Sequence, residues 1–71
     1  MPLAISPIGE AVVVERTPGD ESSKRRLESL GIFAGEKITP LSEDGGNIII
    51  RVGASRIAIN RELAMRIRVR K

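Results

Sequence analysis

Residues 43–47, the turn segment EDGGN, constrain the fold more than any other part of this sequence. Adjacent glycines allow the positive φ angles that tight hairpin turns require. Before them, residues 37–41 alternate with Ile38 pointing inward, and after them Ile48, Ile50 and Val52 share one face. The chain is therefore expected to contain an antiparallel hairpin at this point.

Three other short segments have the residue pattern of strands. Residues 10–16 contain a run of valines, residues 56–59 place Ile57 and Ile59 on one side, and residues 66–70 alternate apolar residues with arginines. Because proline lacks a backbone donor, Pro40 indicates that its strand lies at a sheet edge or ends there. Five short strands joined by tight turns predict a mainly β fold, a small closed or nearly closed barrel.

Two helical segments are expected between these strands. Asp20 begins a short helix over about residues 20–30, with Ser22 and Ser23 as rival caps. Leu27 and Leu30 share one face of it as predicted core residues, and Gly31 supplies the left-handed residue that ends it. Asn60 caps a single helical turn over residues 61–65. With 71 residues in all, the whole chain, 1–71, is expected to form one domain.

The composition excludes several classes of function. The sequence has no Cys and no His, so the commonest metal ligands and the usual general base are missing. We therefore expect no catalytic residues, no cofactor and no metal site. Glu43, Asp44 and Asn47 offer oxygens to a hard cation, but such residues commonly serve turn geometry. The lack of Cys and of a signal-peptide pattern predicts a cytoplasmic location.

Basic residues are concentrated in the last third of the chain. Residues 51–71 hold seven basic side chains and one acid, whereas residues 1–50 hold five basic side chains and eight acids. A basic segment can attract an acidic protein, a nucleic-acid backbone or an anionic membrane, or can be the solvated face of strands. Nucleic-acid binding is thus one alternative function, although small barrels usually stack bases on aromatic side chains and Phe33 is the only aromatic residue.

Phe33 follows directly after the predicted helix end. A lone aromatic residue at such a place most often fills the core. An exposed Phe33 would instead be an apolar anchor ringed by Lys24, Arg25 and Arg56, which is the residue pattern of a docking hot spot. Together with Arg61, these are the predicted partner-binding residues.

The segment 25–38, RRLESLGIFAGEKI, resembles the helix-to-strand signature of the FeoA family. Family members commonly have proline before the glycine of the post-helix turn, where this sequence has Ala34. The resemblance covers about Leu3 to Arg70, and the further segments similar to the family are 48–52, 56–59 and the positions Ala64, Ile67 and Val69.

The resemblance implies an SH3-like barrel that is not an enzyme and takes no small-molecule substrate. It further implies a partner, the cytoplasmic, GTPase-containing part of the ferrous iron transporter FeoB, which the domain would modulate or assemble. Contact with the membrane would then be indirect, through the transporter. The same domain type also occurs as a regulatory SH3-like domain behind iron-dependent repressors, and this is a second alternative.

Overall fold

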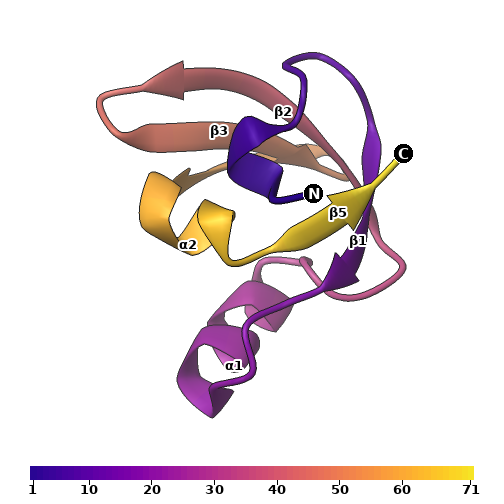
Figure 1. Ribbon diagram of the computed structural model, residues 1–71, viewed down its shortest axis with the longest axis vertical. Coiled ribbons are helices and arrows are strands. Elements are labelled where there is room, and N and C mark those ends of the chain that lie inside the picture. Colours follow the sequence, from indigo (N-terminus) through magenta and orange to yellow (C-terminus); the bar gives the residue numbers. More distant parts are fainter.

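A computed structural model describes all 71 residues as one curled antiparallel sheet with short helical elements around it (Figure 1). The strands are β1 (Val12–Arg16), β2 (Lys37–Asp44), β3 (Asn47–Val52), β4 (Ser55–Asn60) and β5 (Arg68–Arg70). The helical elements are the 3-10 helix η1 (Leu3–Ile5) and the α-helices α1 (Glu21–Ser29) and α2 (Arg61–Met65). The predicted mainly β architecture is confirmed, and η1 is an element that the sequence patterns did not predict.

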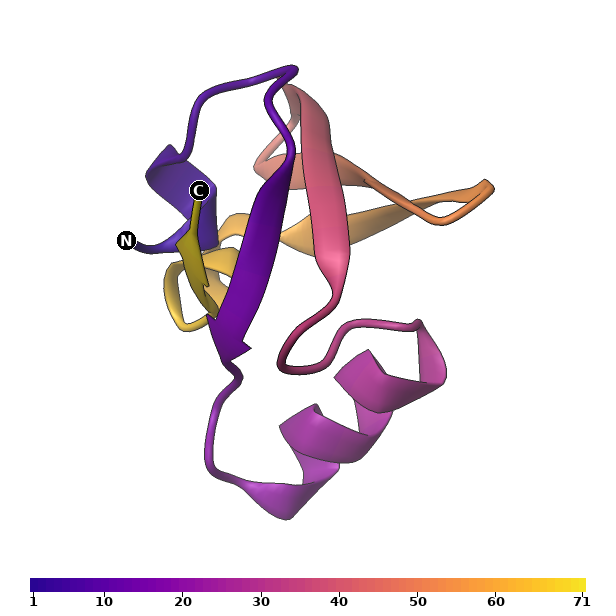
Figure 2. The same cartoon turned by 90° about the vertical axis from the view of Figure 1, so that its right-hand side faces the viewer.

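The strands follow the order β4-β3-β2-β1-β5, and each neighbouring pair is antiparallel. β4 and β5 are the edge strands, so the barrel is nearly closed but has no hydrogen bonds joining its two edges. The first residues run beside β5. The backbone N–H of Leu3 donates to the carbonyl of Ile67 at 2.8 Å, and that of Val69 donates to the carbonyl of Met1 at 2.7 Å. Residues 1 and 71 consequently lie close together (Figure 2).

The hairpin predicted at residues 43–47 joins β2 to β3. Gly45 and Gly46 have φ angles of 57° and 82°, the left-handed pair that a type I′ turn requires. Asp44 and Asn47 face each other across this turn. The glycines therefore fix the position of the turn and the register of β2 and β3 beside it, as far as the register shift between Pro40 and Ser42.

Pro40 lies inside β2, a central strand, so the prediction that its strand lies at an edge or ends there is wrong. The carbonyl of Pro40 accepts a hydrogen bond from Gly9 N–H at 2.7 Å, on the side of β2 that faces away from β3. β1 pairs only with Lys37 and Ile38 of β2. Because the N and O atoms of one residue point to the same side of a strand, the missing donor of Pro40 costs no ladder hydrogen bond.

The core lies on the inner face of the curled sheet and is closed by η1, α1 and α2. The strands supply alternate residues, as the patterns predicted, although Ile57 is only half-buried. The buried apolar cluster consists of Leu3, Val12, Val14, Leu27, Ile32, Ile38, Ile48, Ile50, Val52, Ile59, Ala64, Ile67 and Val69.

α1 lies at one end of the molecule in both views and is mostly exposed (Figure 2). Its N-cap is Asp20, whose carboxylate accepts a hydrogen bond from Ser23 N–H at 3.1 Å. The predicted cap of α2 is also confirmed, because Asn60 Oδ1 accepts a hydrogen bond from Leu63 N–H at 2.7 Å. Local side-chain caps therefore define where both helices begin.

α1 ends in a Schellman motif. Gly31 N–H donates to Glu28 O at 3.0 Å, and Ile32 N–H donates to Leu27 O at 2.8 Å. Gly31 has φ of 88°, and a Cβ atom there would lie 3.0 Å from Cγ1 of Val52. Leu27 and Ile32 are fully buried, which is the apolar contact that accompanies this motif. The helix is thus attached to the core through its last turn.

Candidate partner-docking site

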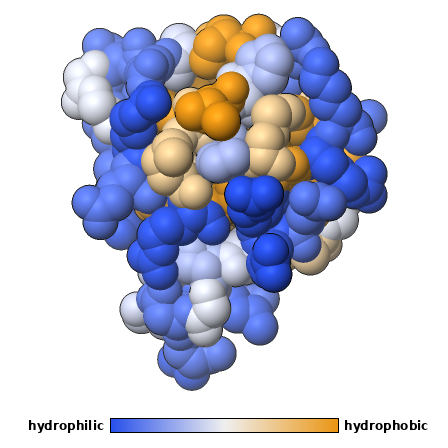
Figure 3. Space-filling view, viewed as in Figure 1, coloured by the Kyte–Doolittle hydropathy of each residue, from blue (hydrophilic) through white to orange (hydrophobic).

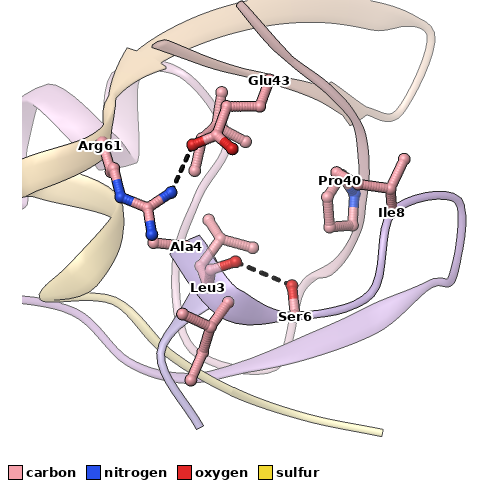
Figure 4. A pocket seen from close by; sticks show the side chains of 9 residues that line it. Leu3, Ala4, Ser6, Ile8, Pro40, Glu43 and Arg61 are labelled. Carbon is pink, nitrogen blue, oxygen red and sulfur yellow. Dashed lines mark hydrogen bonds and ion pairs between the residues drawn. The ribbon is translucent and has the colours of Figure 1, made fainter. Parts of the chain in front are cut away.

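An open apolar groove of about 270 Å³ lies between η1 and the hairpin formed by β2 and β3 (Figure 4). Ile5 and Ile8 line it and are 58% and 54% exposed, more than any other large apolar side chain in the structure. Apolar side chains left exposed at a concave site mark surfaces that bind a partner or ligand. The other lining residues are Leu3, Ala4, Ser6, Pro40, Glu43, Ile48 and Arg61.

The apolar surface is gathered at one end of the molecule. In the space-filling view, orange surface lies over η1 and the neighbouring part of the sheet, and the end formed by α1 is largely blue (Figure 3). Within the groove the buried hydroxyl of Ser6 donates to Leu3 O at 2.8 Å, and no buried side-chain donor or acceptor is without a partner. The apolar part of the groove is therefore suited to an apolar side chain, and charged groups line the remainder.

An ion pair between Glu43 and Arg61 forms the polar rim of the groove (Figure 4). The position of Glu43 depends on an irregularity in β2, where the register with β3 shifts between Pro40 and Ser42. Because of this shift Glu43 pairs with Ile48 and shares its inward face, whereas strict alternation after Pro40 would have turned Glu43 outward. The bulge thus brings a carboxylate to the edge of the apolar groove.

Phe33 is 44% exposed, so this aromatic residue does not fill the core. The Schellman motif explains its position, since Ile32 takes the buried place against Leu27 and the next side chain points away from it. Phe33 borders a second, mostly polar cleft between α1 and the segment that leads into it, and Lys24 lines the same cleft.

The five predicted partner-binding residues do not share one hollow in the structure. Lys24 and Phe33 lie at the polar cleft. Arg25 is exposed on α1 and pairs at 3.7 Å with an acid one turn earlier. Arg56 lies in the edge strand β4, and Arg61 lies at the rim of the apolar groove.

The acids of the hairpin turn are consecutive residues of β2 and therefore point to opposite faces of the sheet. Glu43 faces inward and pairs with Arg61, whereas Asp44 pairs in register with Asn47 at the tip. The structure contains no group of three or more His, Cys, Asp or Glu side chains that could hold a metal ion. None of its helices has the length and apolar character needed to cross a membrane.

The family model of the FeoA domain matches residues 1–71. The chain belongs to the FeoA family. An Fe(2+) transport protein A of Methanocaldococcus jannaschii, so named provisionally, is 40% identical over 68 residues, which are 96% of this chain and 83% of that protein.

Two solved FeoA structures are similar over nearly all of the chain. A crystal structure of the iron uptake regulatory protein FeoA is 34% identical, with a TM-score of 0.89 over 99% of this chain and 95% of that one. The crystal structure of Stenotrophomonas maltophilia FeoA complexed with zinc, described as a unique procaryotic SH3 domain protein, is 28% identical. Its TM-score is 0.81 over 97% of this chain and 88% of that one.

These similarities confirm the family resemblance and the SH3-like fold. FeoA proteins are non-catalytic accessory proteins of transport, so the prediction that the chain is not an enzyme is confirmed by its family. Family membership also associates the chain with Fe²⁺ transport.

The sequence patterns missed the apolar groove. Ile5 and Ile8 stand among Pro2, Pro7 and Gly9, in a segment with neither the period of a helix nor that of a strand. Their only signal was the presence of two large apolar residues, three apart, in a turn-rich segment that offers no regular element to bury them.

Proposed function

We propose that this FeoA-family chain is an accessory protein of ferrous iron uptake that docks on the cytoplasmic, GTPase-containing part of a FeoB-type transporter. In this proposal residues 1–71 act in the cytoplasm as one domain. The observation that carries the proposal is the groove with its two exposed isoleucines, Ile5 and Ile8. The association of the family with Fe²⁺ transport supports the choice of partner.

The groove offers a partner both apolar surface and charged groups that can orient it. Full burial of an isoleucine side chain contributes about 1.5–3 kcal/mol. Ile5 and Ile8 are about half exposed, so a partner that covered either of them would gain roughly half of this free energy. The Glu43–Arg61 pair at the rim can orient the partner by hydrogen bonds without itself having to supply much affinity. An apolar side chain of the partner would therefore enter between η1 and β2.

Docking would act on the transporter by shifting a conformational equilibrium. A bound module stabilises the conformation for which it has the higher affinity. The size of this stabilisation is the difference between its binding free energies for the two conformations. A module of 71 residues without catalytic groups is suited to this role, because it only needs to recognise one surface. Modulation and assembly of the transporter are both consequences of such binding.

The test is an NMR titration of the isotope-labelled chain with the cytoplasmic domain of its cognate transporter, with and without GTP. We expect shifts concentrated at residues 3–8 and at Glu43, Ile48 and Arg61. The substitution Ile8→Ser should weaken binding by about 10-fold, which corresponds to about 1.4 kcal/mol and is within the burial free energy that Ile8 still has to gain. Because Ile8 is exposed, this variant should keep the fold.

Phe33→Ser is the matched control, since Phe33 is also an exposed large apolar residue but lies at the other cleft. It should leave the affinity nearly unchanged. If Phe33→Ser weakened binding and Ile8→Ser did not, docking would take place at the Lys24–Phe33 surface instead. The absence of any shift in both nucleotide states would contradict the proposed docking on this part of the transporter.

A further inference from the structure

The outer face of the sheet carries basic side chains on four of its five strands. Arg51 of β3 pairs directly with Arg56 of β4. Val13 of β1 lies between Lys37 of β2 and Arg70 of β5, with which it pairs on either side. We call Lys37, Arg51, Arg56 and Arg70 the basic stripe. All four side chains are exposed, and they lie on β2, β3, β4 and β5. Lys37 is two residues along β2 from Thr39, the partner of Arg51.

No carboxylate neutralises the basic stripe. The ion pairs of the structure involve Arg25, Arg61, Arg66 and Lys71, and none involves a stripe residue. Like charges directly opposite each other in a sheet are unfavourable, so the Arg51–Arg56 pair has a cost in the isolated chain. An anionic partner would remove that cost.

On the strands β3 and β4 the positions beside the stripe are neutral. Thr39 pairs with Arg51, and Ile49 pairs with Ala58 in the next row of the same face. At the β1–β5 end, Arg16 pairs across the sheet with Arg68, a second pair of like charges, and neither residue forms an ion pair. The acids nearest to the stripe are the half-buried Glu36, which precedes Lys37, and Glu10, whose carboxylate is paired at 3.1 Å with Lys71 beside Arg70.

We propose that the basic stripe contacts an anionic phospholipid surface. Basic side chains near such a surface each add about fivefold to binding, because each contributes about 1 kcal/mol. Because the sheet is curled, the stripe follows a convex surface, and its two directly paired residues, Arg51 and Arg56, are close enough to meet neighbouring headgroups. The stripe lies on an outer sheet face, outside both hollows, and so presents a broad surface rather than a pocket.

A lipid surface fits this face better than nucleic acid does. The face has no aromatic side chain on which a base could stack. The stripe residues all belong to strands, and the helical elements η1, α1 and α2 each contribute one buried residue to the core, namely Leu3, Leu27 and Ala64, so the stripe offers no helix to a major groove. What it offers is a set of exposed charges on long, flexible stems, which is the chemistry that recognises phosphate headgroups.

The choice of a membrane rests in part on the proposed function, since docking on a membrane transporter holds the chain near the bilayer. The stripe and the groove use different faces of the same sheet, because Glu43 is turned inward to the groove and the stripe residues point outward. A chain docked through its groove therefore keeps its stripe free.

The experiment is co-sedimentation of the full chain with vesicles of phosphatidylcholine alone or mixed with phosphatidylglycerol. We expect binding only to the anionic vesicles and a decrease with added salt, because exposed charges are screened. The triple variant Lys37→Gln, Arg51→Gln, Arg56→Gln should lose on the order of a hundredfold in affinity. All three residues are exposed, and a circular dichroism spectrum checks that the variant is folded.

The control variant Lys24→Gln, Arg25→Gln, Arg26→Gln removes the same charge from α1. It should retain most of the binding. An equal loss in both variants would show attraction by net charge alone and would overturn the proposal. The absence of binding to anionic vesicles at low salt, or binding to duplex DNA but not to vesicles, would also overturn it.

The vesicles contain no transporter, so this result is independent of docking. If the chain does not bind anionic vesicles but still docks on the transporter through Ile8, only the proposed lipid contact is disproved. If the chain binds anionic vesicles but does not dock on the transporter, only the proposed protein partner is disproved.

Discussion

Arg66 Nη2 lies 2.5 Å from Asp20 Oδ1, so the residue that caps the start of α1 is held by the residue that ends α2. The two residues are 46 positions apart in the sequence. Both side chains are about half exposed. This contact joins the mostly polar helix α1 to the rest of the molecule at the end opposite its Schellman motif.

The first prediction concerns the pH dependence of stability. Hydrogen bonds from Ser23, and then the contact with Arg66, hold the pKa of Asp20 well below its ordinary value. A carboxyl group with a lowered folded-state pKa stabilises the protein above its ordinary pKa, and this stabilisation is lost as the pH falls toward the folded-state pKa. Urea unfolding midpoints should therefore decrease on acidification below about pH 4.

Asp20→Asn is the variant that isolates this effect. Asparagine is also a good N-cap, so the helix start should persist at neutral pH with a modest loss of stability. Its midpoint should decrease less between neutral and acidic pH than that of the unmodified chain. Parallel decreases in both proteins would show that other carboxyl groups dominate acid unfolding.

The second prediction is that Gly31→Ala destabilises the chain. The left-handed conformation costs a non-glycine residue about 1–2 kcal/mol, and the added Cβ atom would press against Val52 at 3.0 Å. Gly19→Ala is the control, because Gly19 has no positive φ and nothing lies within 4 Å of its added Cβ atom. Thermal unfolding should show a lower midpoint for the first variant and a nearly unchanged one for the second.

The third prediction compares the two leucines of α1. Leu27→Ala should cost about 2–5 kcal/mol, because the side chain is fully buried. A chain of this size rarely has more than about 3–5 kcal/mol of stability in total, so this variant should be largely unfolded by circular dichroism. Leu30→Ala removes a half-buried side chain and should stay folded. Similar effects of the two substitutions would contradict the structure of the helix end.

The fourth prediction is that Ala34→Pro stabilises the chain by about 0.4–1 kcal/mol. Glu36 N–H donates to Phe33 O at 3.0 Å, and Gly35 between them has φ of 91°, which is the pattern of a type II turn. Proline is favoured at the position of Ala34 in such a turn, and no backbone hydrogen bond from Ala34 N–H would be lost. A lower unfolding midpoint would show that Phe33 cannot adopt the extended conformation required before proline.

Much of the fold could be predicted because its signals are local. The glycines at positions 45 and 46 determine a hairpin turn, and alternation assigns the inner face of β3. Asn60 and Gly31 mark helix ends by their own backbone and side-chain chemistry. Such features depend on neighbours a few residues away, which a sequence displays directly.

The place of Pro40 inside a central strand could not be predicted from its neighbours in the sequence. Whether a strand tolerates proline depends on what pairs with its other side, and that is decided by Gly9 and by where β1 ends. The exposure of Phe33 is a similar case, because it depends on which of two adjacent apolar residues reaches the core. The groove, too, brings together residues from η1, β2, β3 and α2, and no single segment contains its pattern.

The pairing of residues 1–3 with residues 67–69 has a consequence for synthesis of the chain on the ribosome. β1 has its second neighbour only when β5 is present, and Leu3 has its backbone partner only when Ile67 is present. The β2–β3–β4 meander can form as soon as residue 60 has emerged, since its pairs are close in sequence. The first strand must wait, with its valines uncovered, until translation has passed residue 69.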